Sequence, residues 1–273
     1  MQKTYPDLKL TLPFCTQEYM SNGQSYYQNF PANIQIVMTG GRVWGEVTNS
    51  FTTTFTNNVG RGPYMWINWP CTDNSKKHLI MGGYTSFLHP GVDPNKIQGI
   101  VLNPMQQSEP SKVAIFGNAC YSWNIWQSEE EAQRCWNASF KYVDHNSALE
   151  TKASAALREL SKHMINQNMD GRVTALQESV DLKDRLASFK EAISNGTTIS
   201  DEQFADLLNE FTILKNASAT YRAQAGDTRV KDQIVYWLNC WDDTTDAAIN
   251  YIKAIKAAQD GDANDKIWDL YAA

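Results

Sequence analysis

Residues 64–74 read YMWINWPCTDN, an apolar run that ends in amide, hydroxyl and carboxylate side chains. Tyr64–Asn68 is the most hydrophobic strand candidate in the chain, because large apolar residues dominate it and turn-forming residues follow it. A simple turn would be enough to end such a strand. The polar end, with Asn68, Thr72 and Asp73, therefore suggests a functional role for these positions.

Short apolar segments like this one recur through the first part of the chain. They lie at Leu8–Phe14, Ile34–Met38, Tyr64–Asn68 and Ile100–Asn103. The intervals between them leave room for helices, which we predict at residues 20–29, 51–58, 75–82 and 111–123. Strand and helix alternating at this spacing favour parallel βα units.

The composition changes near residue 145, where we predict a domain boundary. All nine prolines and eleven of the fifteen glycines precede residue 118, and residues 146–273 contain no proline. Ser200 and Gln203 have the spacing of a capping box, which opens a helix. The second part is predicted to be a helical bundle with helices at residues 149–168, 172–194, 201–222 and 234–255.

Charge, cysteine and histidine patterns exclude several classes of function. The net charge is −6 with a pI near 5.3, so no basic surface for nucleic acid is expected. No apolar run approaches the ~18–20 residues that cross a bilayer. The five cysteines and four histidines lack metal-ligand or disulfide spacing. We therefore expect no metal, cofactor, nucleic-acid or membrane partner, and the first residues show no secretion signal.

The residues that follow the predicted strands share one chemistry. In parallel βα architectures substrates bind at the carboxyl ends of the strands, where the loops converge. These ends deliver neutral hydrogen-bonding groups, aromatic rings and one acid, which suits an uncharged sugar and does not suit a phosphate. In strand order the residues are Cys15 and Tyr19, then Thr39, then Trp66, Asn68 and Asp73, then Asn103.

Each of these residues also has a purely structural interpretation. Asp73 could cap the helix predicted to start near Ser75, and Asn103 precedes Pro104 as in an ordinary turn. Cys15 and Trp66 could be core residues. Only the shared location at strand ends favours a site. The adjacent pair Asp242 and Asp243 lies within a helical pattern and is expected on a solvated face.

At these positions the chain resembles glycoside hydrolase family 84, the β-N-acetylglucosaminidases that include animal O-GlcNAcases and bacterial enzymes described as hyaluronidases. The matching segments keep the family's order over roughly residues 8–149. They are CTQEY (15–19), MTGGRV (38–43), YMWINWPCTDNSKKHLIMGGY (64–84), IQGIVLNPMQQSEPSKVAIFGNACYSW (97–123) and DHNSAL (144–149). The resemblance implies the C-terminal half of a TIM barrel, strands five to eight, over residues 1–145, and a helical bundle over 146–273.

The resemblance also implies roles for the site residues. Cys15 would line the pocket of the N-acetyl methyl group, and Tyr19 would hydrogen-bond near the acetamido group. Thr39 and Val43 would form pocket wall. Trp66 and Asn68 would shape the acetamido side, and Asp73 with Asn103 would hold the outer hydroxyls. Three departures affect the pocket shape: Met38 stands where the family has Trp, Ile67 where it has an aromatic residue, and Asn74 where it has Tyr.

The family's catalytic pair of aspartates has no counterpart in the matched segments, since it follows the fourth barrel strand. We therefore expect negligible turnover by this chain alone. Half a barrel would expose sheet edges, so the expected partners are the N-terminal half of the barrel or a second copy, besides an N-acetylglucosamine glycoconjugate. A truncated, non-catalytic binding or interaction module and a dimerising structural module are the alternatives. Bacterial relatives are exported and animal ones intracellular, which leaves the compartment undecided.

Overall fold

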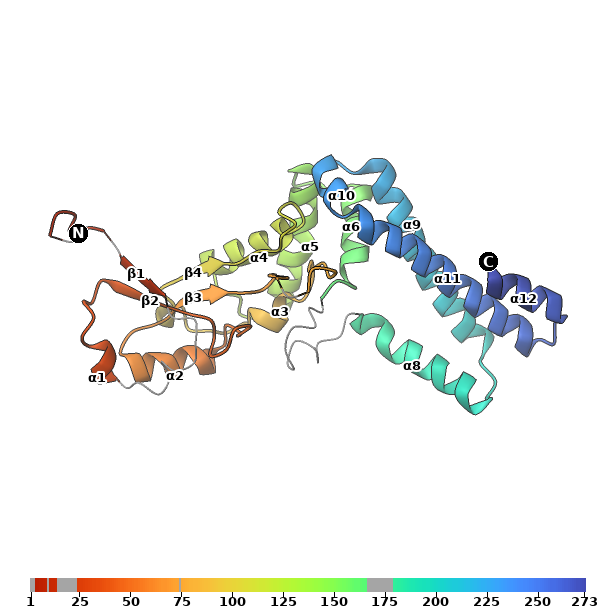
Figure 1. Cartoon of the computed structure of the whole chain (residues 1–273), viewed down its shortest axis with the longest axis horizontal. Helices are drawn as coiled ribbons and strands as arrows, with labels where there is room; N and C mark the ends of the chain where they lie inside the picture. Colours follow the sequence, from red (N-terminus) through yellow and green to blue (C-terminus); the bar gives the residue numbers. More distant parts are fainter. Residues whose placement is uncertain (1–2, 9, 14–23, 74, 166–178) are drawn as a thin grey trace. The chain divides into compact units, whose positions relative to one another are not determined.

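Four short strands form the sheet of this chain, seen in a computed structural model that describes residues 3–8, 10–13, 24–73, 75–165 and 179–273 (Figure 1). Contacts divide the chain into two compact units, one running through Ser139 and the other beginning at Phe140. The first unit holds the sheet and the second is helical. Each unit is described by itself below.

The sheet is parallel and its strands follow the order β1-β2-β3-β4. The strands are β1 (Leu10–Pro13), β2 (Ile34–Met38), β3 (Tyr64–Ile67) and β4 (Gly99–Leu102). Leu10 pairs with Ile34, Met38 with Met65, and Ile67 with Leu102. The four predicted strands and their parallel pairing are thus confirmed. Parallel neighbours bring their carboxyl ends to one edge of the sheet.

Helices lie between the strands of this unit, and two longer ones follow the last strand. The main ones are α2 (Asn49–Val59), α4 (Lys112–Trp123) and α5 (Glu129–His145), with the shorter α1 (Gln24–Tyr27), α3 (Tyr84–Phe87) and 3-10 helix η2 (Pro94–Lys96). Thr48 begins α2 by accepting a hydrogen bond from Phe51 N at 3.0 Å, and Gly60 ends it with φ of 81°.

The helix predicted at residues 75–82 is wrong, because this segment forms a turn and otherwise irregular backbone. Leu79, Ile80 and Met81 are all buried, so the segment lacks the single apolar side that a surface helix has. Its backbone groups bind elsewhere instead. Ile80 N donates to Met105 Sδ, and the Met81 carbonyl accepts a hydrogen bond from Trp136 Nε1 at 2.8 Å.

Arg61 stabilises the turn that leads into β2. Its two terminal nitrogens donate to five backbone carbonyls, at distances of 2.7–3.5 Å. The acceptors belong to Tyr27, Phe30, Pro31, Ala32 and Ile34. A cluster of buried side chains lies beside this turn and fixes α1 and α2 against β2; its members are Tyr27, Ile36, Met38, Phe55 and Val59.

The second unit contains further helices beyond the end of α5. They are α6 (Lys152–Ser161), α8 (Val180–Asn195), α9 (Asp201–Gln224), α10 (Thr228–Gln233), α11 (Val235–Gln259) and α12 (Asn264–Ala272). The capping box of Ser200 and Gln203 at the start of α9 is confirmed. Helix α9 packs against α6 and α11. Helix α11 covers the helix predicted at residues 234–255, and Leu238, Thr245 and Ile252 on it are buried.

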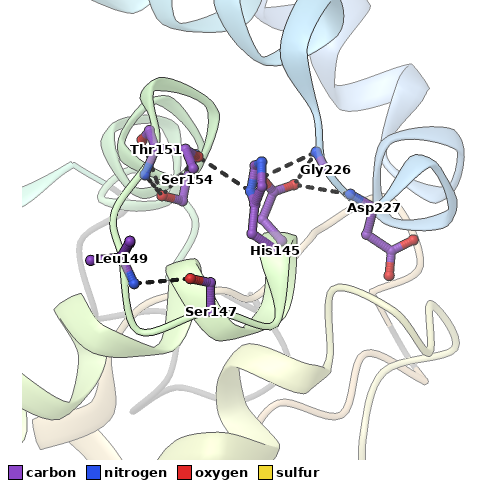
Figure 2. A network of polar contacts seen from close by, with 8 residues as sticks. His145, Ser147, Leu149, Thr151, Ser154, Gly226 and Asp227 are labelled. Carbon is purple, nitrogen blue, oxygen red and sulfur yellow. Dashed lines mark hydrogen bonds and ion pairs between the residues drawn. The ribbon is translucent and has the colours of Figure 1, made fainter.

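A network of polar contacts that includes His145, Thr151 and Gly226 joins three segments of the helical unit (Figure 2). Asp144, whose side chain is fully buried, lies 2.5 Å from His145 Nδ1 and accepts from Gly226 N at 3.2 Å. His145 Nδ1 also lies 3.2 Å from Thr151 Oγ1, the N-cap of α6. The end of α5, the start of α6 and the α9–α10 connection are thereby held together.

Candidate functional site

Glycines shape the loop that follows β2. Gly40 has φ of 78°, and a Cβ placed there would lie 2.7 Å from Glu46 O. A Cβ on Gly45 would lie 1.9 Å from Thr39 O. Only glycine fits at either position, since the two arms of the loop touch through their backbones. The tight fold of the loop fixes the position of its tip, where Val43 lies.

Asn68 is the centre of a hydrogen-bonded cluster at the carboxyl ends of β3 and β4. Its Oδ1 accepts from Trp66 Nε1 at 2.8 Å and from Asn103 Nδ2 at 3.1 Å, and its Nδ2 donates to Val43 O at 2.5 Å. The register explains the meeting of the two asparagines. Ile67 pairs with Leu102, so Asn68 and Asn103 are the next residues along neighbouring parallel strands.

The Asn68 cluster leaves some polar groups uncommitted. Both lone pairs of Asn68 Oδ1 are used and its side chain is almost fully buried, so Asn68 positions its neighbours. Asn103 is half-buried, and its Oδ1 has no hydrogen bond among the described residues. Trp66 is also half-buried with its indole N–H already paired. An aromatic ring and a free amide oxygen are what a sugar ring with hydroxyls binds.

Asp73 lies on the same connection and is exposed. The interpretation of Asp73 as a helix cap is excluded, because no helix starts near Ser75. It lies beside Cys71, a buried free thiol. Burial raises the pKa of the Cys71 thiol, the Asp73 backbone N–H opposes this rise, and the Asp73 carboxylate adds to it. The carboxylate of Asp73 is left accessible to a ligand.

Of the remaining predicted residues, the structure describes Thr39 and Val43. Thr39 is the first residue after β2 and is 3% exposed, with no hydrogen-bond partner for its Oγ1 in the described part of the chain. The Val43 side chain is 50% exposed, while its carbonyl serves Asn68. Cys15 and Tyr19 lie outside the described residues. The hydrogen bonds therefore bring together Val43, Trp66, Asn68 and Asn103.

Sequence reasoning missed the pairing of Glu46 with His89, next to the loop after β2. Glu46 Oε2 lies 2.5 Å from His89 Nε2, and Arg42 approaches the other carboxylate oxygen at 3.9 Å. The backbones of Val47 and Leu88 form an isolated parallel bridge beside this pair. No spacing pattern in the sequence predicts a contact between Glu46 and His89, which lie 43 positions apart. The glycines of TGGRVWG (39–45) were the available signal that this loop folds tightly.

The chemistry of this site is that of neutral hydrogen bonding around an aromatic ring. Among residues 24–73, 75–165 and 179–273, with the short segments before them, no group of three His, Cys, Asp or Glu side chains could hold a metal ion. No helix in the described part of the chain is both long and apolar enough to span a bilayer.

Comparison with known proteins gives a consistent family. The family profile of β-N-acetylglucosaminidases matches residues 1–162. The structure of CpGH84D is similar, with a TM-score of 0.84 and 26% identity, over 99% of this chain and 45% of that one. CpGH84B matches with a TM-score of 0.72 and 18% identity, over 90% of this chain and 41% of that one.

A mutant of the Thermobaculum terrenum O-GlcNAc hydrolase has the same fold, with a TM-score of 0.75 and 18% identity over 98% of this chain and 56% of that one. The chain thus spans about half the length of the solved structures it matches. Because the profile match covers more than half of its residues, the chain belongs to the β-N-acetylglucosaminidases of glycoside hydrolase family 84.

Proposed function

We propose that this chain supplies the sugar-holding part of a β-N-acetylglucosaminidase, which removes terminal N-acetylglucosamine from a glycoconjugate with retention of configuration. The Asn68 cluster carries the proposal, because it fixes an indole ring and a free amide oxygen at the ends of two adjacent strands. Such a pair recognises a pyranose through its apolar face and its hydroxyls. Membership in the family supports the choice of N-acetylglucosamine.

The proposed roles of the residues follow the family pattern. Trp66 and Asn68 shape the acetamido side of the pocket, with Cys15 at the methyl group and Tyr19 near the acetamido oxygen. Thr39 and Val43 form the wall. Asp73 and Asn103 hold the outer hydroxyls, for which the exposure of Asp73 and the free oxygen of Asn103 are suitable.

The proposed architecture is half a TIM barrel followed by a helical bundle, with the domain boundary near residue 145. The four parallel strands in consecutive order are suited to being strands five to eight of a closed barrel. Among the described strands, β1 and β4 each pair on one side only. The proposed partner is a set of further βα units, or a second copy, that covers these edges.

Catalysis in this scheme needs two carboxylates. One orients the acetamido group, whose oxygen attacks the anomeric carbon, and the other gives a proton to the departing glycosidic oxygen. The described strand ends offer no pair of adjacent acids. Asp242 and Asp243 lie on α11, where Asp242 pairs with Ser218 and Arg222. We propose that the catalytic pair comes from residues other than these 273.

A binding experiment tests the sugar-holding role. Titration with N-acetylglucosamine should show saturable binding that Asn103→Ala weakens about tenfold, through the loss of about 1.4 kcal/mol of hydrogen bonding. The matched control is Asn33→Ala, in an exposed turn before β2. Equal affinity of the two variants would contradict the placement of the sugar at Asn103.

An activity experiment tests the division of labour. The 273-residue chain should release no aryl alcohol from an aryl N-acetylglucosaminide, and a second chain that carries the remaining βα units should restore release. Turnover by the 273 residues alone would refute the proposal about the catalytic pair. Sugar binding without any restored turnover would favour the second candidate, a non-catalytic binding or interaction module, which the missing acid pair at the described strand ends also supports.

A further inference from the structure

The loop after β2 meets the segment after α3 through backbone and side chains at one place. Val47 N donates to Phe87 O at 2.8 Å, and Val47 O accepts from His89 N at 3.1 Å. These bonds make a parallel bridge between Val47 and Leu88. Side chains alternate along extended backbone, so Glu46, before one bridged residue, and His89, after the other, project from the same face of the bridge. The backbone therefore brings these two side chains together.

His89 is the anchored member of the pair. Its carbonyl accepts from the hydroxyl of Tyr121 at 2.7 Å, and Tyr121 is completely buried on α4. Two residues later, Gly91 N donates to Trp126 O at 2.7 Å. The backbone around His89 is thus tied to α4 and to the residues that follow it. Glu46 Oε2 lies 2.5 Å from Nε2 of the His89 ring. Because an ionised carboxylate only accepts, Nε2 carries a proton and donates it to this contact.

Glu46 in turn determines where the tip of the loop lies. A Cβ on Gly40 would lie 2.7 Å from Glu46 O and 2.8 Å from Glu46 N, so the first arm of the loop packs directly on the Glu46 backbone. At the tip, the Val43 carbonyl accepts from Asn68 Nδ2 at 2.5 Å. Asn68 Oδ1 accepts from Trp66 Nε1 at 2.8 Å. A continuous set of contacts therefore runs from the histidine to the indole ring of the candidate site.

We propose that Glu46 and His89 are positioning residues for the Asn68 cluster. Their pairing fixes the loop of residues 40–45, and the loop fixes the cluster through its tip. Arg42 is exposed and approaches the other oxygen of Glu46 at only 3.9 Å, so it contributes less than the histidine. Neither member of the pair has to touch a ligand. The expected effect on sugar affinity rests on the proposed function, whereas the expected effect on the cluster itself does not.

Two amides of different length test the pairing. The amide nitrogen of glutamine lies as far along the side chain as Nε2 of histidine, whereas that of asparagine lies no farther than Nδ1. His89→Gln should therefore keep the contact with Glu46 and keep the affinity for N-acetylglucosamine within about twofold. His89→Asn and His89→Ala should each weaken that affinity about fivefold, because Glu46 loses its donor. Calorimetric titration of the whole chain measures these affinities.

A readout without sugar separates this inference from the proposed function. The indole N–H of Trp66 donates to Asn68 Oδ1, so its NMR signal reports the geometry of the cluster. Its loss in Trp66→Phe identifies the signal among those of the nine tryptophans. His89→Asn and His89→Ala should displace the signal, and His89→Gln should leave it in place. If the unchanged chain binds no N-acetylglucosamine, the proposed function fails and the Trp66 signal alone decides the inference.

Val59→Ala is the control for a general loss of stability. Val59 is buried at the end of α2 that leads into β3, away from the candidate site. Its truncation should lower the thermal midpoint and leave both the Trp66 signal and the sugar affinity unchanged. The inference is overturned if the signal stays in place in folded His89→Ala and His89→Asn. It is also overturned if His89→Gln behaves like His89→Asn, or if Val59→Ala displaces the signal equally.

Discussion

Asn68 and Asp144 are both buried polar residues that join segments far apart in sequence, but they use their hydrogen bonds differently. Asn68 contacts two side chains, Trp66 and Asn103, that keep part of their surface open. The side chain of Asp144 is completely buried, and its carboxylate contacts His145 and accepts a hydrogen bond from the backbone of Gly226. A buried hub whose neighbours retain free groups can position a binding site. A hub such as Asp144, whose contacts tie the end of α5 to the α9–α10 connection, serves the fold.

The largest expected effect is at the sealed hub. Asp144→Ala removes charge-assisted hydrogen bonds and leaves the Gly226 N–H without its acceptor, which should lower the free energy of unfolding by about 3 kcal/mol. Urea unfolding followed by circular dichroism measures this. The matched control is Asp243→Ala, an exposed carboxylate on α11, with an expected change within about 0.5 kcal/mol. Equal costs for the two variants would show that Asp144 is no hub.

Gly226 sharpens the same point through shape alone. A Cβ there would lie 2.6 Å from Asp144 O and 2.7 Å from the His145 ring. Gly226→Ala should cost about 2 kcal/mol of unfolding free energy through overpacking. In a His145→Ala background the cost should be smaller but still present, because the backbone contact remains. A double-mutant cycle with no coupling would contradict this arrangement.

The open hub should give a smaller loss of stability and a clearer loss of binding. Asn68→Ala removes three side-chain hydrogen bonds and should lower the unfolding free energy by about 1–2 kcal/mol. It also frees Trp66 and Asn103 from their positions, so binding of N-acetylglucosamine should weaken about tenfold or more. Calorimetric titration and urea unfolding separate the two effects. Unchanged sugar affinity in a folded Asn68→Ala protein would contradict the proposal that Asn68 positions Trp66 and Asn103.

The smallest expected effect comes from His163, which is buried between the end of α6 and the residue before α8. Its Nδ1 lies 2.8 Å from Ser179 Oγ, and its ring lies 5.4 Å from that of Trp241. Burial lowers the pKa of His163 below 6.5; Glu210, Glu159 and Asp181 oppose this, and Lys162 adds to it.

The sign of the pH dependence follows from that direction. The unfolded chain takes up the proton of His163 more readily than the folded chain, so stability is complete above pH 6.5 and falls as the pH drops below it toward the folded pKa. Thermal midpoints measured between pH 7.5 and 5 should therefore fall less for His163→Gln than for the unchanged chain. Parallel curves for the two proteins would refute the assignment to His163.

The strands were predictable because proline, glycine and amide residues lie between their apolar runs and mark where each run ends. The segment at 75–82 was not, since Asp73 is a residue type that often caps a helix, while Leu79–Met81 are buried together in irregular backbone. The sequence placed Asn68 and Asn103 at neighbouring strand ends. It could not show that Asn68 Oδ1 accepts hydrogen bonds from both Trp66 and Asn103, because these contacts depend on the register of β3 and β4.

Arg61 has a consequence for how the first unit tolerates mutation. All five of its acceptors are main-chain oxygens, so the arginine holds the path of the turn and is indifferent to the side chains at Pro31, Ala32 and Asn33, which are exposed. Lysine has no planar fork to reach the same oxygens. The turn should therefore tolerate substitution of its own side chains, whereas substitution of Arg61, which lies outside the turn, should disturb its path.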